Sequence, residues 1–159
     1  EISLGLVGSE MCIRDSAWVQ MFDTEYDAFK TYCELYPGNA IMLVDTYDTL
    51  KKGVPAAIRV FKEMREEGNP MKFYGIRLDS GDLAYLSKKA RKMLDDAGFT
   101  DAGICASSDL DEYLIDSLLS QGACIDSWGV GTNLITSKNT NLHFFIERFR
   151  RNSNHSSHI

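Results

Sequence analysis

The stretch KFYGIRLDSGDLAYLSKKARKMLDDAG, residues 72–98, decides the fold. It begins with an apolar run that predicts a strand over Lys72–Leu78 and continues through a polar loop. An amphipathic helix is predicted over Asp82–Ala97, and Gly98 ends it. The sequence on both sides repeats this order of strand, loop and helix.

Three further strands and three further helices follow from the same patterns. The strands are predicted at Ala40–Asp45, Gly103–Ser107 and Ile125–Val130, and the helices at Thr24–Tyr36 (ended by Pro37-Gly38), Val54–Glu67 and Leu110–Gln121. Strands that alternate with helices pair in parallel through right-handed crossovers, so the fold class is α/β. An open doubly wound sheet and a segment of a barrel both fit. Every strand ends in polar or glycine-rich residues, which favours a barrel segment with adjacent strands and helices on one outer face.

Composition excludes several classes of protein. The chain has 159 residues, a net charge of -6 and 44% hydrophobic residues, which is typical of one globular domain or a piece of one. Its acidity argues against a nucleic-acid partner, and no apolar run is long enough for a membrane span. Four cysteines without a CxxC pair argue against zinc. No secretory leader is recognisable, so a cytoplasmic location is expected.

The two ends differ from the middle. The opening EISLGLVGSEMCIRDS has neither helical nor strand periodicity and resembles translated read-through of a sequencing adapter. Residues 139–159 hold four Asn, three Arg and all three His of the chain. We interpret residues 1–16 as a non-native leader, 17–138 as a partial α/β-barrel catalytic domain, and 139–159 as a non-native or disordered tail. The alternative is a flexible native arm and a basic tail.

The segment RLDSGD, residues 77–82, is the strongest candidate for a ligand site. Asp79 and Ser80 can cap the helix that begins near Asp82, and Asp82 suits its positive end. Capping does not explain Arg77, because a buried guanidinium needs a carboxylate or phosphate partner.

Three other strand ends carry polar residues. The glycine-rich GVGT, residues 129–132, is either a tight turn or a phosphate cradle of backbone N–H groups. In DTYDT, residues 45–49, capping accounts for Asp48 and Thr49 and leaves Asp45 as the ligand candidate. In SSDLDE, residues 107–112, Ser108 or Asp109 fits a capping box.

Four motifs in this order and spacing resemble nicotinate phosphoribosyltransferase of the bacterial type. They are WVQMFDTEYDAF (residues 18–29), LVDTYDTLKKGVPAAI (43–58), RLDSGD (77–82) and WGVGTNLITS (128–137). The resemblance covers Ala17 to about Lys138 and implies an irregular α/β barrel of the type II phosphoribosyltransferases, present here as a central fragment. It also implies a homodimeric parent in NAD biosynthesis.

The resemblance further implies a reaction and a set of site residues. Family members join nicotinate to 5-phosphoribosyl 1-diphosphate, coupled to ATP hydrolysis and with Mg2+, and release nicotinate mononucleotide and diphosphate. Roles carried over by motif place Arg77 at the pyridine ring or its carboxylate, Asp79 at the ribose hydroxyls and Asp45 on the diphosphate side. Ser80 and Gly81 are also expected to bind substrate. Gly129, Gly131 and Thr132 fall in the 5'-phosphate loop.

One departure from the family pattern concerns catalysis. The family histidine that ATP phosphorylates precedes the tryptophan matched by Trp18, and here Ser16 stands at about its position. The glycine-containing continuation of the phosphate loop after Ser137 is missing too. We therefore expect the chain as written to be inactive. The alternatives are a phosphate-binding module without catalysis and a metal-dependent barrel enzyme that uses Asp45, Asp79 and Asp109.

Overall fold

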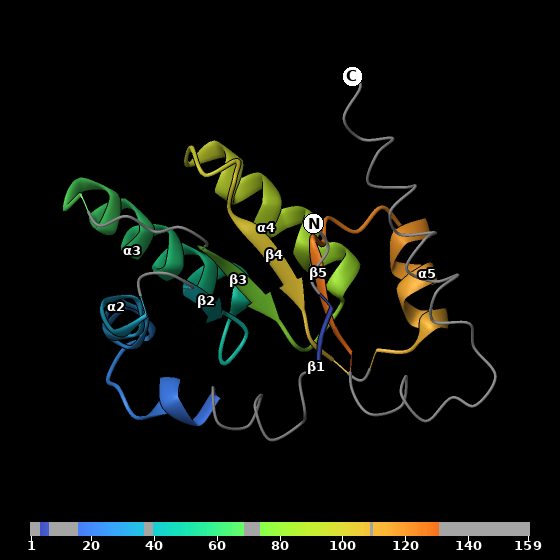
Figure 1. The fold of residues 1–159 in the computed structure, drawn as a ribbon, viewed down its shortest axis with the longest axis horizontal. Coiled ribbons are helices and arrows are strands. Elements are labelled where there is room, and N and C mark those ends of the chain that lie inside the picture. The colour runs from blue at the N-terminus through green and yellow to red at the C-terminus, as the bar shows by residue number, and fades with distance from the viewer. Residues whose placement is uncertain (1–3, 7–15, 37–39, 69–73, 109, 131–159) are drawn as a thin grey trace.

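The computed structural model describes residues 4–6, 16–36, 40–68, 74–108 and 110–130, and its centre is a parallel sheet (Figure 1). The sheet has the order β1-β5-β4-β3-β2. Its strands are β1 (Leu4–Leu6), β2 (Ala40–Leu43), β3 (Tyr74–Leu78), β4 (Gly103–Ala106) and β5 (Ser127–Val130). All four pairings are parallel, so the predicted set of adjacent parallel strands from residue 40 onward is confirmed.

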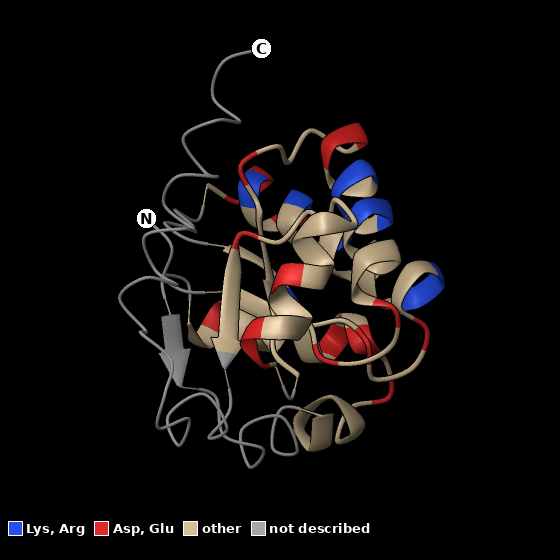
Figure 2. Cartoon of the chain, turned by 90° about the vertical axis from the view of Figure 1, so that its right-hand side faces the viewer, with Lys and Arg blue, Asp and Glu red and all other residues tan. Residues whose placement is uncertain are grey.

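The helices lie at the predicted places and gather on one side of the sheet (Figure 2). They are α2 (Glu25–Leu35), α3 (Val54–Glu66), α4 (Leu83–Asp96) and α5 (Glu112–Ser120), with one π-helical turn, η1 (Thr49–Gly53), before α3. Residues 16–20 are also helical. A doubly wound sheet carries helices on both faces, whereas one covered face is the arrangement of a barrel segment. The described strands form an open sheet, so barrel closure stays a prediction.

The helix starts correct two capping predictions. Helix α4 is capped by Asp82, whose side chain accepts from Tyr85 N, and α5 by Asp111, whose side chain accepts from Leu114 N. Asp79 and Ser80 therefore do not cap α4, because that helix starts later than they can reach. Ser108 does not cap α5 for the same reason, and Asp109 lies outside the described residues.

The core lies between the sheet and the helices. Ile76 and Leu78 of β3 and Ile104 of β4 are fully buried, and they alternate along their strands with residues that face the other way. The Phe61 and Phe99 rings lie 5.7 Å apart between centroids and both contact the Tyr74 ring. This aromatic group anchors α3 to the sheet.

A short segment of the opening residues, Leu4–Leu6, contributes a strand to the sheet. Leu4–Leu6 forms β1 and pairs in parallel with Trp128–Val130 of β5. A three-residue apolar run is too short to show periodicity, yet it can add to an open strand edge. The non-native origin of residues 1–16 stays a prediction, and residues 139–159 lie outside the described residues.

The burial of the cysteines and the length of the helices bear on two further points. Cys33 is fully buried, and burial raises the pKa of its thiol to about 12, whereas Cys105 and Cys124 are only half-buried. Among the helices that the structure describes, none has the length and apolar character needed to cross a bilayer. Pro37-Gly38 lies outside the described residues.

Candidate functional site

The register of the sheet brings four candidate positions into one row. Leu43, Arg77, Cys105 and Ser127 are cross-strand partners on β2 to β5. Two residues further along the four strands come Asp45, Asp79, Ser107 and Gly129. Side chains alternate along a strand, so both rows belong to the face opposite Ile76 and Leu78, the face that the helices leave open. The predicted strand-end residues therefore share one edge and one face.

The Asp45 carboxylate holds the loop after β3. Its Oδ2 accepts from Asp79 N at 2.7 Å, from Ser80 N at 2.7 Å and from the Ser80 hydroxyl at 2.9 Å. Val44 N donates to Arg77 O at 3.2 Å, which extends the pairing of β2 and β3 to the edge of the site. Two residues predicted from separate motifs are thus joined directly.

Asp79 is joined in turn to the next strand. The Ser107 hydroxyl donates to Asp79 Oδ1 at 3.0 Å, and Ser107 N donates to Leu78 O at 2.9 Å. Ser107 is buried, with 2% of its surface exposed, and Asp79 is half-buried. Hydrogen bonds therefore run from the end of β2 across the β3 loop to the end of β4.

The remaining candidates divide between described and undescribed residues. Arg77 is buried in β3, with 7% of its surface exposed, and its pairing with a carboxylate or phosphate stays a prediction. Gly81 has a φ of 81°, a left-handed conformation that glycine adopts without strain. Gly129 lies in β5, whereas Gly131 and Thr132 fall outside the described residues. Ser16 begins the helical residues 16–20 and is half-buried.

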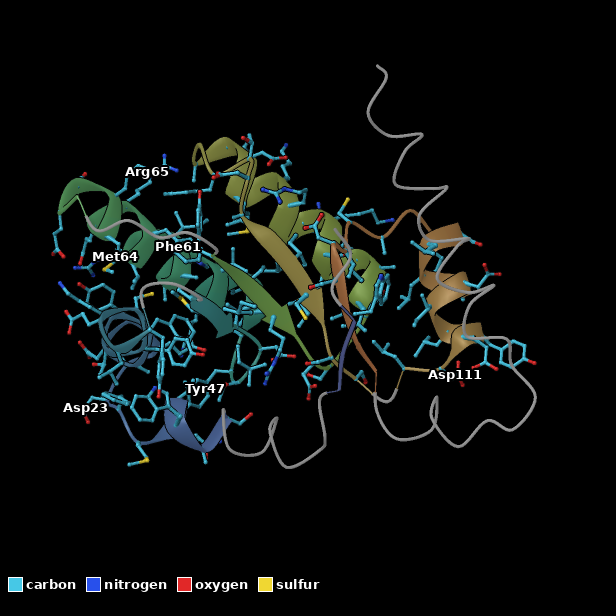
Figure 3. All side chains as sticks on the ribbon, in the orientation of Figure 1. Asp23, Tyr47, Phe61, Met64, Arg65 and Asp111 are labelled. Atoms are coloured by element: carbon cyan, nitrogen blue, oxygen red, sulfur yellow. The ribbon has the colours of Figure 1, made fainter. Side chains whose placement is uncertain are left out.

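A π-helical turn packs directly against the end of β2. A side chain at Gly53 would place its Cβ 1.9 Å from Val44 O, so only glycine allows this approach. Asp48 caps the turn by accepting from Lys51 N at 3.0 Å, as its sequence predicts. Single π-helical turns occur frequently at functional sites. Figure 3 shows Tyr47, just before this turn, and Asp111 along the same lower edge of the molecule.

The same neighbourhood holds a buried carboxylate. Glu25, the first residue of α2, exposes 7% of its surface, and its Oε1 accepts no hydrogen bond from the described residues. Burial raises the pKa of Glu25, nearby Asp48 raises it further, and Lys52 opposes both. The amino-acid pattern gave no sign of this group, because Glu25 also suits the first turn of an exposed helix.

Ser107 is the site residue that sequence reasoning did not single out. It was noted only as one polar residue at a strand end. The signal lay in the register, because Leu78 pairs with Ala106 and the residues that follow them, Asp79 and Ser107, must then be neighbours.

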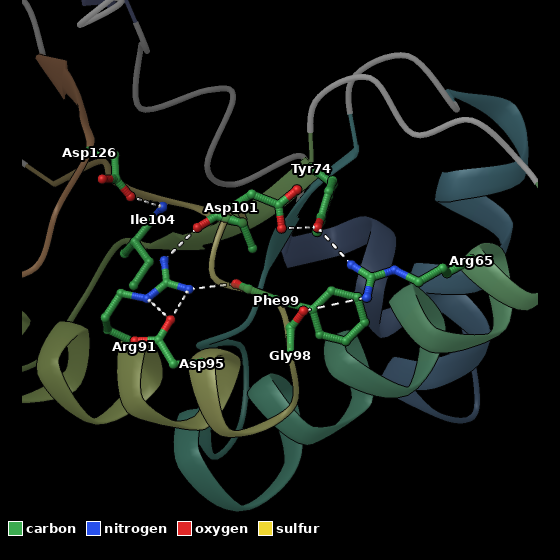
Figure 4. A network of polar contacts seen from close by, with 10 residues as sticks. Arg65, Tyr74, Arg91, Asp95, Gly98, Phe99, Asp101, Ile104 and Asp126 are labelled. Atoms are coloured by element: carbon green, nitrogen blue, oxygen red, sulfur yellow. Dashed lines mark hydrogen bonds and ion pairs between the residues drawn. The ribbon is translucent and has the colours of Figure 1, made fainter.

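The opposite edge of the sheet holds a second polar cluster (Figure 4). The Tyr74 hydroxyl donates to Asp101 Oδ1 at 2.5 Å and accepts from Arg65 Nη2 at 3.2 Å. Arg91 donates to Ala102 O and to Phe99 O, both at 2.6 Å. These groups tie α3, α4 and the start of β4 together, which is a structural role.

The chain is similar in sequence to several known proteins. The nicotinate phosphoribosyltransferase of Bacillus subtilis is 64% identical over 121 residues, which are 76% of this chain and 24% of that protein. The chain is homologous to a segment of nicotinate phosphoribosyltransferases. A Mycobacterium tuberculosis member of this group is 46% identical over 77% of the chain and 25% of its own length. The chain thus spans about a quarter of the curated nicotinate phosphoribosyltransferases it matches.

A solved structure supports the fold separately. The crystal structure of human nicotinic acid phosphoribosyltransferase superposes with a TM-score of 0.60 at 24% identity, over 74% of this chain and 27% of that chain. At this identity the likeness concerns the fold alone. A scan against protein-family models finds no match.

Proposed function

We propose that this segment belongs to a protein that joins nicotinate to 5-phosphoribosyl 1-diphosphate and releases nicotinate mononucleotide and diphosphate. The observation that carries the proposal is the 64% identity to the Bacillus subtilis nicotinate phosphoribosyltransferase. The row of Asp45, Asp79 and Ser107 supports it, because ligands of parallel α/β folds bind at the carboxyl ends of strands. ATP coupling, a homodimeric parent and a cytoplasmic place in NAD biosynthesis belong to the same proposal.

The chemistry sets what the residues must do. The pyridine nitrogen forms a bond to C1' of the ribose while the bond from C1' to the diphosphate oxygen breaks. Positive charge grows on the ribose during this exchange, so fixed negative groups and held hydroxyls lower the barrier. Asp79 accepts hydrogen bonds from the ribose hydroxyls, Arg77 pairs with the nicotinate carboxylate, and Gly129 belongs to the 5'-phosphate loop.

The site fits a magnesium ion that enters with the substrate. Asp45 and Asp79 supply hard oxygen donors, and among the described residues no group of three or more His, Cys, Asp or Glu can hold a metal by itself. That donor set suits an ion bound largely by the diphosphate oxygens. When bound, Mg2+ neutralises charge on the departing diphosphate.

A chimera tests the proposal. The 121 matched residues of this chain replace their counterpart in the Bacillus subtilis nicotinate phosphoribosyltransferase, and synthesis of nicotinate mononucleotide is measured with nicotinate, 5-phosphoribosyl 1-diphosphate, Mg2+ and ATP. We expect turnover within about tenfold of the Bacillus protein. A folded chimera that binds phosphate without any turnover would instead favour a phosphate-binding module.

The chain of residues 1–159 by itself provides a second test of the proposal. We expect no ATP-coupled synthesis from it, because Ser16 has neither the basicity nor the near-neutral pKa with which a histidine accepts and releases a phosphoryl group. The same assay applies. Turnover close to that of the chimera would show that residues 1–159 contain the whole catalytic apparatus.

A further inference from the structure

The Asp79 carboxylate is oriented from a neighbouring strand. The donor is the Ser107 hydroxyl, 28 residues away at the end of β4, at 3.0 Å from Asp79 Oδ1. We propose that Ser107 is a positioning residue that holds the Asp79 carboxylate in place to bind the ribose hydroxyls of the substrate. This inference rests on the proposed function, in which Asp79 binds the ribose.

The other carboxylates of this loop have different tasks. Asp45 Oδ2 accepts from the backbone N–H groups of Asp79 and Ser80, which fixes the path of the loop. Asp82 caps α4. Asp45 thus holds the backbone at residue 79, and the Ser107 hydroxyl holds one oxygen of the Asp79 carboxylate.

Ser107 is well suited to hold a side chain still. Its own backbone N donates to Leu78 O at 2.9 Å, so it continues the pairing of β4 with β3 by one residue. With 2% exposure, its hydroxyl sits among packed atoms. Supports built on sheet backbone place functional groups more accurately than supports on loops. A hydroxyl that donates to a carboxylate also makes a strong, charge-assisted hydrogen bond.

This arrangement predicts a specific kinetic effect. Without the Ser107 hydroxyl, the Asp79 carboxylate loses the hydrogen bond to its Oδ1, and fewer molecules hold it where charge grows on the ribose. The loss falls on the transition state more than on substrate binding, so kcat falls while KM changes little. Misplacement of about 1 Å costs roughly 100-fold in rate, so we expect a loss between about tenfold and 100-fold.

The experiment compares two buried serines in the full-length chimera. Ser107→Ala removes the proposed support, and Ser107→Thr restores a hydroxyl. Ser87→Ala is the matched control: Ser87 is also fully buried, donates to Ala84 O at 3.2 Å and accepts from Cys124 N at 3.1 Å, away from the strand ends. We expect Ser107→Ala to lower kcat, Ser107→Thr to recover most of it, and Ser87→Ala to change thermal stability but not kcat.

A double-mutant cycle with Asp79→Ala decides whether Ser107 acts through Asp79. If it does, Ser107→Ala has no further effect on kcat once Asp79 is replaced by alanine. Independent, multiplicative losses would overturn the inference, as would an unchanged kcat in Ser107→Ala alone. A chimera that shows no synthesis before any substitution would overturn the proposed function together with this inference. An active chimera with an unchanged kcat in Ser107→Ala would overturn this inference alone.

Discussion

The two edges of the same sheet use polar residues in opposite ways. At the amino edge, the Tyr74 hydroxyl accepts from Arg65 and donates to Asp101, which joins α3 to the sheet. At the carboxyl edge, Asp45 and Ser107 hold a loop and a carboxylate in place. The first set joins structural elements to one another, while the second fixes groups on the face of the sheet that the helices leave open.

The difference teaches where function and stability reside in this fold. In parallel α/β folds, residues at the carboxyl ends of strands serve ligands, and residues at the amino ends serve stability. Glu25 lies buried near Asp48 and Lys52 of the segment after β2, and burial raises the pKa of its carboxyl group. Among the described residues, the carboxyl edge thus contains a buried carboxylate whose Oε1 accepts no hydrogen bond, which costs stability.

The largest expected effect is a separation of activity from stability between the edges. In the chimera, Asp79→Ala should lower kcat by roughly 100-fold or more, because it removes a fixed negative group beside the developing charge. Its free energy of unfolding should fall by no more than about 1–3 kcal/mol, the cost of losing the hydrogen bond to the buried Ser107 hydroxyl. Asp101→Asn is the comparison at the amino edge, and it should keep specific activity per folded molecule. Equal losses of activity at both positions would break the division of roles.

The amino edge should lose stability in acid. The Tyr74 hydroxyl, followed by Arg65 and Arg91, lowers the pKa of Asp101 against the opposing effect of burial. The contribution of Asp101 is therefore complete above its ordinary pKa of about 4 and disappears as pH falls through the lower folded value.

Urea unfolding of this chain measures that contribution. Asp101→Asn should cost about 0.5–1 kcal/mol at pH 7, a small value because Asp101 is exposed, and nearly nothing at the lowest pH at which the chain stays folded. The exposed residue Asp96 supplies the control, and Asp96→Asn should show no such pH dependence. A cost that stays constant down to that pH would show that Asp101 acts through something other than its charge.

Sequence patterns predicted most of the fold and only part of the site. Strands and helices agreed to within a few residues, because apolar runs and helical spacing record burial directly. The capping residues of α4 and α5 were placed too early, since several acidic and hydroxyl residues in a row are equally good caps by type.

Contacts between residues far apart in the sequence could not be predicted from sequence patterns. The bond from Ser107 to Asp79 and the packing of Gly53 on Val44 both depend on strand register. Strand β1 was missed because three residues carry no periodicity. Burial of Glu25 depends on how α2 meets η1, which local spacing does not encode.

The smallest expected effect concerns that buried carboxylate. Burial raises the pKa of Glu25, so in the folded protein it holds its proton at a pH where the unfolded chain has released it. Stability then falls as pH rises from the ordinary value of about 4 through the raised folded value. Glu25→Gln removes the charge and should stabilise the chain by up to about 1 kcal/mol at pH 8 and by little at pH 4.

Glu66, which is exposed at the end of α3, supplies the matched control, and Glu66→Gln should behave like the unaltered chain at both pH values. Urea midpoints at the two pH values measure the difference. If Glu25→Gln instead made the chain less stable at pH 8, Lys52 would already compensate the buried charge, and the carboxyl edge would then be as well paired as the amino edge.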